Sequence, residues 1–257
     1  MSNPNQPFDL ERYIMSHVLD SKEWHLPFLP PIHLPGYLTL HGVMLLLCSA
    51  LLLFLFLILY KKKAKSPKGI TNCLEVLVIF VRDQIAIASL GEKDGRKMAP
   101  FFCTLFFFIL GLNLLGAVPL FATATGNINV TGALALVTLS FMIFGAIQKN
   151  GVGGFFKALM PSGVPIPLLI FLVPLEFLGL FIRSFALMIR LFANMFAGHI
   201  VILALLGLVV TLGYVALPAV LLALFVSILE VGIAFLQAYI FTLLSAIFIG
   251  MMYHPSH

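Results

Sequence analysis

Charged residues are scarce in this chain. Asp, Glu, Lys and Arg make up 10% of its 257 residues, whereas 61% are hydrophobic. Soluble domains carry about 25% charged residues, so the composition argues against a water-soluble globule. No polar block long enough for a soluble domain interrupts the apolar runs. The composition therefore predicts a polytopic membrane protein with a single membrane domain.

Cysteine is also rare. Cys48, Cys73 and Cys103 show no CxxC spacing, which indicates neither a disulfide framework nor a zinc site. The excess of basic residues lies in short loops, a distribution typical of membrane orientation rather than of nucleic-acid binding. The first 40 residues lack a basic region followed by an apolar run, so we expect no cleavable signal peptide before the first span. We also expect no bound cofactor, no metal and no nucleic-acid partner.

Residues 1–40 are polar and contain several prolines, and we expect them to form an extracytoplasmic segment outside the membrane domain, 41–257. From this segment to the first residue of the membrane domain, histidine recurs at every eighth position, at His17, His25, His33 and His41. The intervening prolines exclude one continuous helix, and no short ligand pair such as HxxxH occurs. An ordinary polar segment is therefore favoured over a metal site.

Nearly uncharged runs predict about five transmembrane helices, because ~17–25 apolar residues cross the hydrocarbon core. The expected spans lie near 42–60, 98–118, 131–147, 167–211 and 214–252. The stretch near 70–90 is apolar but interrupted by Glu75, Arg82 and Asp83. Glu75 and Arg82 are seven residues apart and share a helical face, so an interfacial amphipathic helix is expected here.

Basic residues in the loops predict the orientation. The cluster KKKAKSPK at 61–68 follows the first span, and the positive-inside rule places that end in the cytoplasm, or in the matrix of an organelle. The polar loop expected at 91–97 and the glycine-rich loop between Lys149 and Lys157 fall on the same side. The uncharged connection at 119–130 falls on the other. The N-terminus is therefore expected outside and the C-terminus inside.

The last two apolar runs are about twice as long as the hydrocarbon is thick. A 40-residue helix measures ~60 Å, and neither run has a polar hairpin at its middle. We therefore expect two long, steeply tilted helices separated by a turn at Gly213 and Pro218. The predicted fold class is all-α.

The first of these two runs contains several ionisable groups that are costly in hydrocarbon. Arg183 and Arg190 follow Glu176 at seven and fourteen residues, so the three lie close to one helical stripe. Asn194 extends this stripe by one turn. His199 is nine residues beyond Arg190 and faces the opposite side of the helix.

The second run carries Glu230 and Gln237, seven residues apart on one face. One interpretation of the whole polar set is structural: Arg183 pairs with Glu176, and Asn194 and Gln237 form interhelical hydrogen bonds worth ~0.6 kcal/mol each. The other is a proton path. A helix would place Glu176 ~21 Å from Arg190 on one side and His199 ~13 Å on the other. Every member is titratable or forms hydrogen bonds, which favours the proton path.

Three stretches resemble subunit a of the F-type ATP synthase, the stator that faces the rotating c-ring. They are ILGLNLLGAVP at 109–119, RLFANMFAGH at 190–199 and LQAYIF at 236–241. They occur in the order expected for the family, and the resemblance covers the chain from about residue 40 onward.

The resemblance implies roles for single positions. Arg190 matches the essential arginine of the family, and Asn194, Gln237 and Glu176 match its neighbouring asparagine, its last-helix glutamine and the acid on the cytoplasmic side. Many bacterial members have an acid at the position of His199 and a histidine at that of Glu230, so the pair is exchanged here, as in mitochondrial members. The exchange predicts that the two side chains are neighbours. Arg183 matches a position that is often basic.

The implied function is that of a stator subunit with two offset proton half-channels separated by Arg190, without catalysis by this chain alone. The implied partners are the c-ring, the subunit b peripheral stalk, the whole synthase and membrane lipid. A bacterial inner membrane is the expected location, with an organelle inner membrane as the alternative. The residues leave open whether the ion is H⁺ or Na⁺. The rival hypothesis is a secondary transporter that uses Glu176, Arg190 and Glu230, but we find no internal repeat of the kind that such transporters carry.

Overall fold

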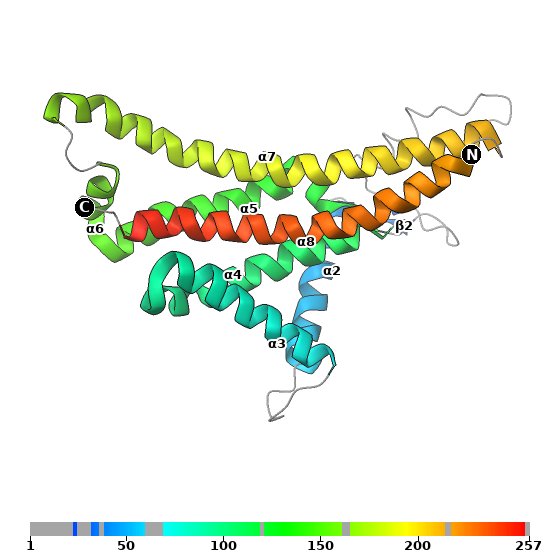
Figure 1. Cartoon of the computed structure of the whole chain (residues 1–257), viewed down its shortest axis with the longest axis horizontal. Coiled ribbons are helices and arrows are strands. Elements are labelled where there is room, and N and C mark those ends of the chain that lie inside the picture. The colour runs from blue at the N-terminus through cyan, green and yellow to red at the C-terminus, as the bar shows by residue number, and fades with distance from the viewer. Residues whose placement is uncertain are drawn as a thin grey trace. The chain divides into compact units, whose positions relative to one another are not determined.

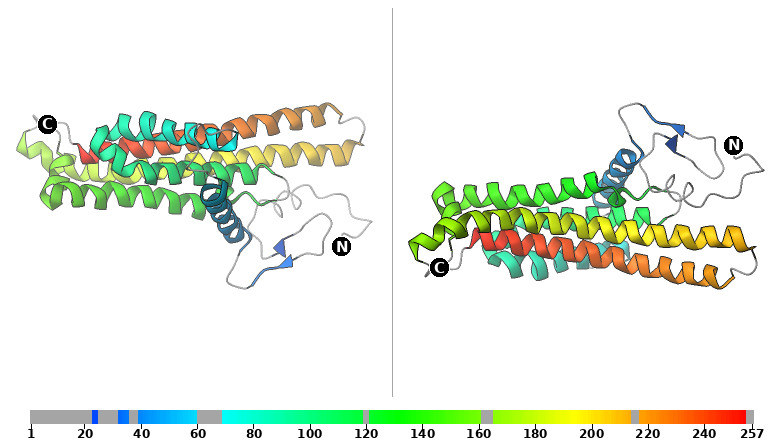
Figure 2. Two further views of the ribbon diagram at one scale, coloured as in Figure 1. Left: turned by 90° about the horizontal axis from the view of Figure 1, so that it is seen from below. Right: turned by 90° about the horizontal axis from the view of Figure 1, so that it is seen from above.

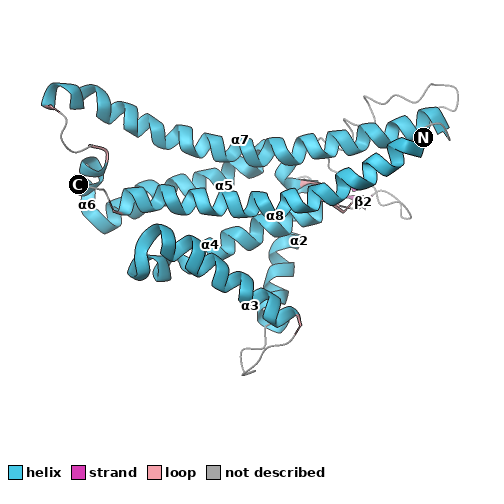
Figure 3. Ribbon diagram, viewed as in Figure 1, coloured by secondary structure: helices cyan, strands magenta, loops and turns pink. Residues whose placement is uncertain are grey.

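The computed structural model describes residues 23–24, 32–35, 39–59, 69–118, 121–160, 165–213 and 217–254. Helix accounts for nearly all of this part of the chain (Figure 3), which confirms the all-α prediction. Most of the N-terminal segment, including His17 and His25, lies outside the described residues, as does the basic cluster at 61–68. Two short strands, β1 (Glu23–Trp24) and β2 (Ile32–His33), form an antiparallel pair.

Five helical segments of the described chain are long and apolar enough to cross a membrane, which confirms the predicted number. A spanning segment must satisfy its backbone groups internally because hydrocarbon offers no hydrogen-bond partner, and a continuous helix does so. These segments are Leu40–Leu57, Ile70–Gly116, Ile128–Ala158, Pro167–Val209 and Leu217–Tyr253.

Among the shorter helices, α3 joins α4 and α5 joins α6 end to end through π-helical turns. The elements in order are α2 (Leu40–Phe54), η1 (Leu55–Leu59), α3 (Ile70–Phe80), η2 (Val81–Ile87), α4 (Ala88–Gly116), the 3₁₀ turn η3 (Ala124–Gly126), α5 (Ile128–Ser140), η4 (Phe141–Gly145) and α6 (Ala146–Ala158).

The two expected long helices are present as α7 (Ile166–Leu212) and α8 (Leu217–Tyr253), each a single labelled ribbon in Figure 1. They contain 47 and 37 residues, and Pro174 lies inside α7 without ending it. Gly213 has a φ of 58°, a left-handed conformation that suits glycine at a helix end. Pro218 follows in the first turn of α8, where its missing N–H leaves no hydrogen bond unmade. The two runs are thus separate helices, with the break between Leu212 and Leu217 as predicted.

The polar loops predicted at 91–97 and between Lys149 and Lys157 are wrong, because both stretches are helical. Each contains a single break in the helical conformation, at Gly91 (φ 78°, ψ 170°) and at Gly151 (φ 73°, ψ 170°). Lys, Arg and Glu have high helix propensity, so charge alone does not stop a helix.

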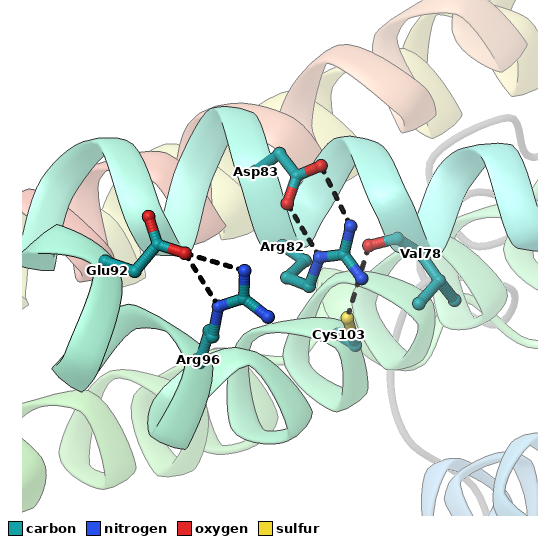
Figure 4. A network of polar contacts seen from close by, with 6 residues as sticks. All are labelled: Val78, Arg82, Asp83, Glu92, Arg96 and Cys103. Atoms are coloured by element: carbon teal, nitrogen blue, oxygen red, sulfur yellow. Dashed lines mark hydrogen bonds and ion pairs between the residues drawn. The ribbon is translucent and has the colours of Figure 1, made fainter.

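Ion pairs between nearby residues support the first of these stretches. The guanidinium of Arg96 lies 2.6 Å from Glu92, four residues earlier (Figure 4). In the preceding π-helical turn, Arg82 forms two hydrogen bonds with the adjacent Asp83, at 2.6 and 3.0 Å. Arg82 thus pairs with its immediate neighbour in the predicted amphipathic stretch.

The chain divides into two compact units, each assembled from three separate stretches. The first unit comprises Met1–Leu51, Ile109–Val130 and Leu191–Gln237. In it the last part of α7 and the first part of α8 run side by side in both views of Figure 2, drawn in yellow and orange. Gly111 brings α4 close to α2, since a β-carbon there would lie 2.8 Å from the Cys48 sulfur.

The second unit comprises Leu52–Phe108, Thr131–Arg190 and Ala238–His257. Its core contains large, fully buried side chains such as Phe102, Phe106 and Phe241. Near the ends of its helices, Asp94 Oδ2 lies 2.5 Å from Lys149 Nζ and 3.0 Å from His254 Nε2. These contacts join α4, α6 and the end of α8 within the unit.

Candidate functional site

His199 lies between two polar partners in the first unit. Its Nδ1 is 3.0 Å from Glu230 Oε1 on α8, and its Nε2 is 2.6 Å from the hydroxyl of Thr123, just before η3. The side chains of His199 and Glu230 are 21% and 4% exposed. The prediction that His199 and Glu230 are neighbours is confirmed. Thr123, a partner that the sequence analysis missed, joins the 119–130 connection to the pair.

Two glycines allow these side chains to approach their neighbouring helices. A β-carbon at Gly198 on α7 would lie 2.9 Å from Glu230 Oε1, the same oxygen that meets His199. A β-carbon at Gly116, the last residue of α4, would lie 2.9 Å from Thr123 Cγ2. Helix interiors disfavour glycine, so its presence in α7 is explained by the space that Glu230 needs.

Asn194 and Gln237 form a second polar pair in the same unit. Asn194 Nδ2 donates a hydrogen bond of 2.8 Å to Gln237 Oε1. Gln237 is buried, and its own Nε2 has no hydrogen-bond partner among the described residues. The first unit thus brings together four of the six predicted site residues in two pairs, both between α7 and α8.

Glu176 and Arg183 form an ion pair in the second unit. Arg183 Nη2 lies 2.6 Å from Glu176 Oε1, and the guanidinium carbon stands 5.9 Å from the centre of the Phe248 ring. The contact between Arg183 and Glu176 that the structural interpretation predicted is therefore present. The pair is partly exposed, with side chains 25% and 41% accessible.

Arg190 differs from Arg183. Its Nη1 is buried and has no hydrogen-bond partner in the described part of the chain. Buried polar atoms are nearly always hydrogen-bonded, and a guanidinium stays charged in proteins. Arg190 is thus a half-buried cation with one buried N–H group that has no partner in the described part of the chain.

Further buried polar atoms lack partners among the described residues, namely both amide atoms of Asn113 and the hydroxyls of Thr125 and Ser184. Asn113 lies one helical turn before Gly116, and Thr125 is two residues after Thr123. Buried groups of this kind are commonly satisfied by internal water. The sequence analysis missed them because an uncharged residue in an apolar run carries no signal of its own. The polar, uncharged composition of the 119–130 connection was the available hint.

Within the described residues, no three His, Cys, Asp or Glu side chains gather in a way that could hold a metal ion. Of the four periodic histidines, His41 is buried, and its Nδ1 lies 3.0 Å from Asn127 Nδ2 in the first unit. In the first unit, the His199–Glu230 pair offers an imidazole and a carboxyl group, both of which can bind and release protons.

Comparison with known proteins identifies the family of this chain. Residues 42–250 match the family described as ATP synthase A chain. The chain belongs to the ATP synthase A chain family. The matched range includes all six predicted site residues and also Thr123.

Several curated proteins of the ATP synthase A chain family named "ATP synthase subunit a" are similar to the chain. The protein of Anaeromyxobacter dehalogenans (strain 2CP-C) is 51% identical over 217 residues, which are 82% of this chain and 57% of the relative. The protein of Chloroherpeton thalassium is 46% identical over 99% of this chain and 79% of the relative. The protein of Myxococcus xanthus is 44% identical over 94% of this chain and 87% of the relative. The chain thus spans a little over half the length of the Anaeromyxobacter relative.

Proposed function

We propose that this chain is the membrane stator subunit of a rotary F-type ATP synthase and carries protons to and from the c-ring. The observation that carries the proposal is Arg190, an intramembrane arginine whose buried Nη1 has no partner in the described chain. A charged side chain at the bilayer centre costs about 2.5–3.5 kcal/mol on insertion scales. Arg183, seven residues earlier, pairs with Glu176. An unpaired Arg190 fits an anion supplied by another subunit.

That anion is the carboxylate of a c-subunit. A guanidinium attracts an ionised carboxylate and favours its charged form. The c-subunit carboxylate would lose its proton as it reaches Arg190 and would need a new one before it turns back into lipid. Arg190 would also prevent direct passage of protons between the two half-channels because its positive charge repels them.

Protons would reach the ring through an outer half-channel lined by Asn194, His199, Glu230 and Gln237. The two pairs formed by these residues, and the buried polar atoms of Asn113 and Thr125 that lack protein partners, support a hydrated path here. An inner half-channel near Glu176 would return protons to the cytoplasm. The driving force is ~2.3 kcal/mol for each charge that crosses 100 mV.

The apolar surface of the long helices supports a partner within the membrane. Only 11% of the most apolar stretch of α7 and 17% of that of α8 is buried within the chain, as is 17% of Leu40–Leu57, against 50% of the most apolar stretch of Ile70–Gly116. We propose that the c-ring and lipid cover α7 and α8, and that a subunit b peripheral stalk completes the stator. The location we propose is a bacterial inner membrane, with the N-terminus outside and the C-terminus in the cytoplasm.

The test replaces Arg190 in the intact synthase. Arg190→Ala should abolish ATP synthesis driven by a proton gradient in membrane vesicles while passive proton leak remains. Arg190→Lys keeps the charge but not the planar fork and controls for assembly. Synthesis that persists in Arg190→Ala would overturn the proposal. The rival transporter hypothesis predicts that the purified chain moves solute in liposomes, whereas a stator subunit without its ring should not.

A further inference from the structure

Thr123 occupies a position from which its hydroxyl can serve two partners. The side chain is buried, and its Oγ1 lies 2.6 Å from His199 Nε2 and 3.4 Å from the carbonyl oxygen of Gly116. Gly116, which has no side chain, leaves the space that the threonine methyl fills. All these atoms, and Glu230 on the far side of the imidazole, belong to the first unit.

Simple hydrogen-bond rules link the protonation state of Glu230 to the tautomer of His199 and the orientation of the Thr123 hydroxyl. A neutral imidazole has one N–H donor and one acceptor nitrogen, and a hydroxyl can both donate and accept. When Glu230 is ionised, His199 Nδ1–H donates to Oε1, so Nε2 accepts from the Thr123 hydroxyl. When Glu230 is protonated, its O–H donates to Nδ1, and Nε2–H donates to Thr123 Oγ1. The hydroxyl then donates to the Gly116 carbonyl.

We propose that Thr123 is a positioning residue of the proton path. Its hydroxyl turns between His199 Nε2 and the Gly116 carbonyl oxygen. In this way it stabilises either tautomer of His199 as Glu230 gains or loses its proton. Between the two arrangements His199 Nδ1–H gives its proton to Glu230, and Nε2 takes up one proton from a hydronium ion, which is left as water. The ring is neutral before and after, with its single proton first on Nδ1 and then on Nε2. This inference rests on the proposed function, since it assigns a role within the outer half-channel.

The geometry separates a role of the hydroxyl from a role in packing. Valine has the shape of threonine without the hydroxyl, so Thr123→Val keeps the contact with Gly116 and removes both hydrogen bonds. Thr123→Ser keeps the hydroxyl and removes the methyl group. Thr123→Ala and Thr123→Ser form a second pair that differs only in the hydroxyl, which preserves the comparison if the valine variant does not assemble.

The first measurement is the initial rate of ATP-driven proton pumping into inverted vesicles, normalised to the assembled synthase. We expect Thr123→Val and Thr123→Ala to lower the rate about tenfold, because His199 Nε2 loses the Thr123 hydroxyl as its hydrogen-bond partner in both arrangements. Thr123→Ser should stay within about twofold of the wild type, since it retains that hydrogen bond. A serine variant that is impaired beside a normal valine variant would overturn the inference in favour of packing.

The second measurement is the ¹⁵N spectrum of the His199 ring in the histidine-labelled synthase, assigned by its loss in His199→Gln. Wild type and Thr123→Ser should populate both tautomers, and Thr123→Val should hold the ring with its proton on Nδ1. Identical spectra of the wild type and the valine variant would overturn the inference. If His199→Ala stops pumping while all Thr123 variants pump normally, the inference fails and the proposed function stands. If His199→Ala and Arg190→Ala also pump normally, the proposed function itself fails.

Discussion

Gly198 offers a direct way to disturb the His199–Glu230 contact without removing either side chain. In Gly198→Ala the new β-carbon would lie 2.9 Å from Glu230 Oε1, whereas ordinary contacts begin at 3.4 Å. The carboxylate must therefore retreat by roughly 0.5 Å. Because the same oxygen lies 3.0 Å from His199 Nδ1, that distance grows towards ~3.5 Å, where a hydrogen bond is nearly lost.

The expected cost follows from the kind of bond that is weakened. A hydrogen bond to a charged group contributes ~1.5–3 kcal/mol, and each 1.4 kcal/mol corresponds to a factor of about ten. We expect ATP-driven proton pumping by Gly198→Ala vesicles to fall at least about tenfold. Alanine has a higher helix propensity than glycine by ~0.8–1.0 kcal/mol, so α7 itself should not be weakened, and the synthase should assemble in normal amounts.

Gly153 provides the matched control. It lies inside α6, and nothing stands within 4 Å of the position that a β-carbon would take. Gly153→Ala should therefore pump and assemble like the wild type. If Gly198→Ala pumps as fast as Gly153→Ala at equal amounts of assembled synthase, the close approach of Glu230 to α7 does not limit the rate of proton pumping. That result would refute the proposed importance of the His199–Glu230 contact.

Two further substitutions test other parts of the structure. Arg183→Gln breaks a partly exposed ion pair with Glu176, which is worth about 1 kcal/mol or less. The rate of proton pumping should therefore fall only a few-fold, whereas Arg190→Ala should abolish pumping. An equal loss of pumping in both variants would contradict the distinction between the two arginines. Gly91→Ala places a side chain at φ 78°, ψ 170°, which costs ~1–3 kcal/mol. The midpoint of thermal unfolding should therefore fall by several degrees, whereas Gly153→Ala, which gains helix propensity at an open position, should not lower it. An unchanged midpoint in Gly91→Ala would show that the break at Gly91 is not required.

The helices were predictable because hydrocarbon leaves few choices. A long apolar run must be helical to satisfy its backbone, and the turn between α7 and α8 has the glycine and proline that its ends require. The two wrong predictions of loops had a different cause. Residues 91–97 are polar and most of them are exposed, but Glu92, Lys93, Arg96 and Lys97 are good helix formers. Polarity predicted exposure there, and only Gly91 departs from the helical conformation.

The site was predictable where charge marked it. An acid and a histidine that exchange places suggested the His199–Glu230 contact, which the structure confirms at 3.0 Å. Thr123 carried no comparable mark, because a threonine in a polar connection has many ordinary explanations. Its role depends on a contact across 76 positions of the chain. Such a contact depends on the tertiary packing of the residues before η3 against α7, which no local sequence pattern predicts.

The spacing along α7 determines which arginine is left without a partner. Glu176 precedes Arg183 by seven residues, a rise of ~10 Å that two extended side chains can bridge, and they meet at 2.6 Å. It precedes Arg190 by fourteen, a rise of ~21 Å that no pair of side chains can bridge. Asn194, one turn beyond Arg190, has its amide nitrogen on Gln237. A helix with one acid and two arginines at this spacing thus pairs the first arginine and leaves the second beyond the reach of that acid.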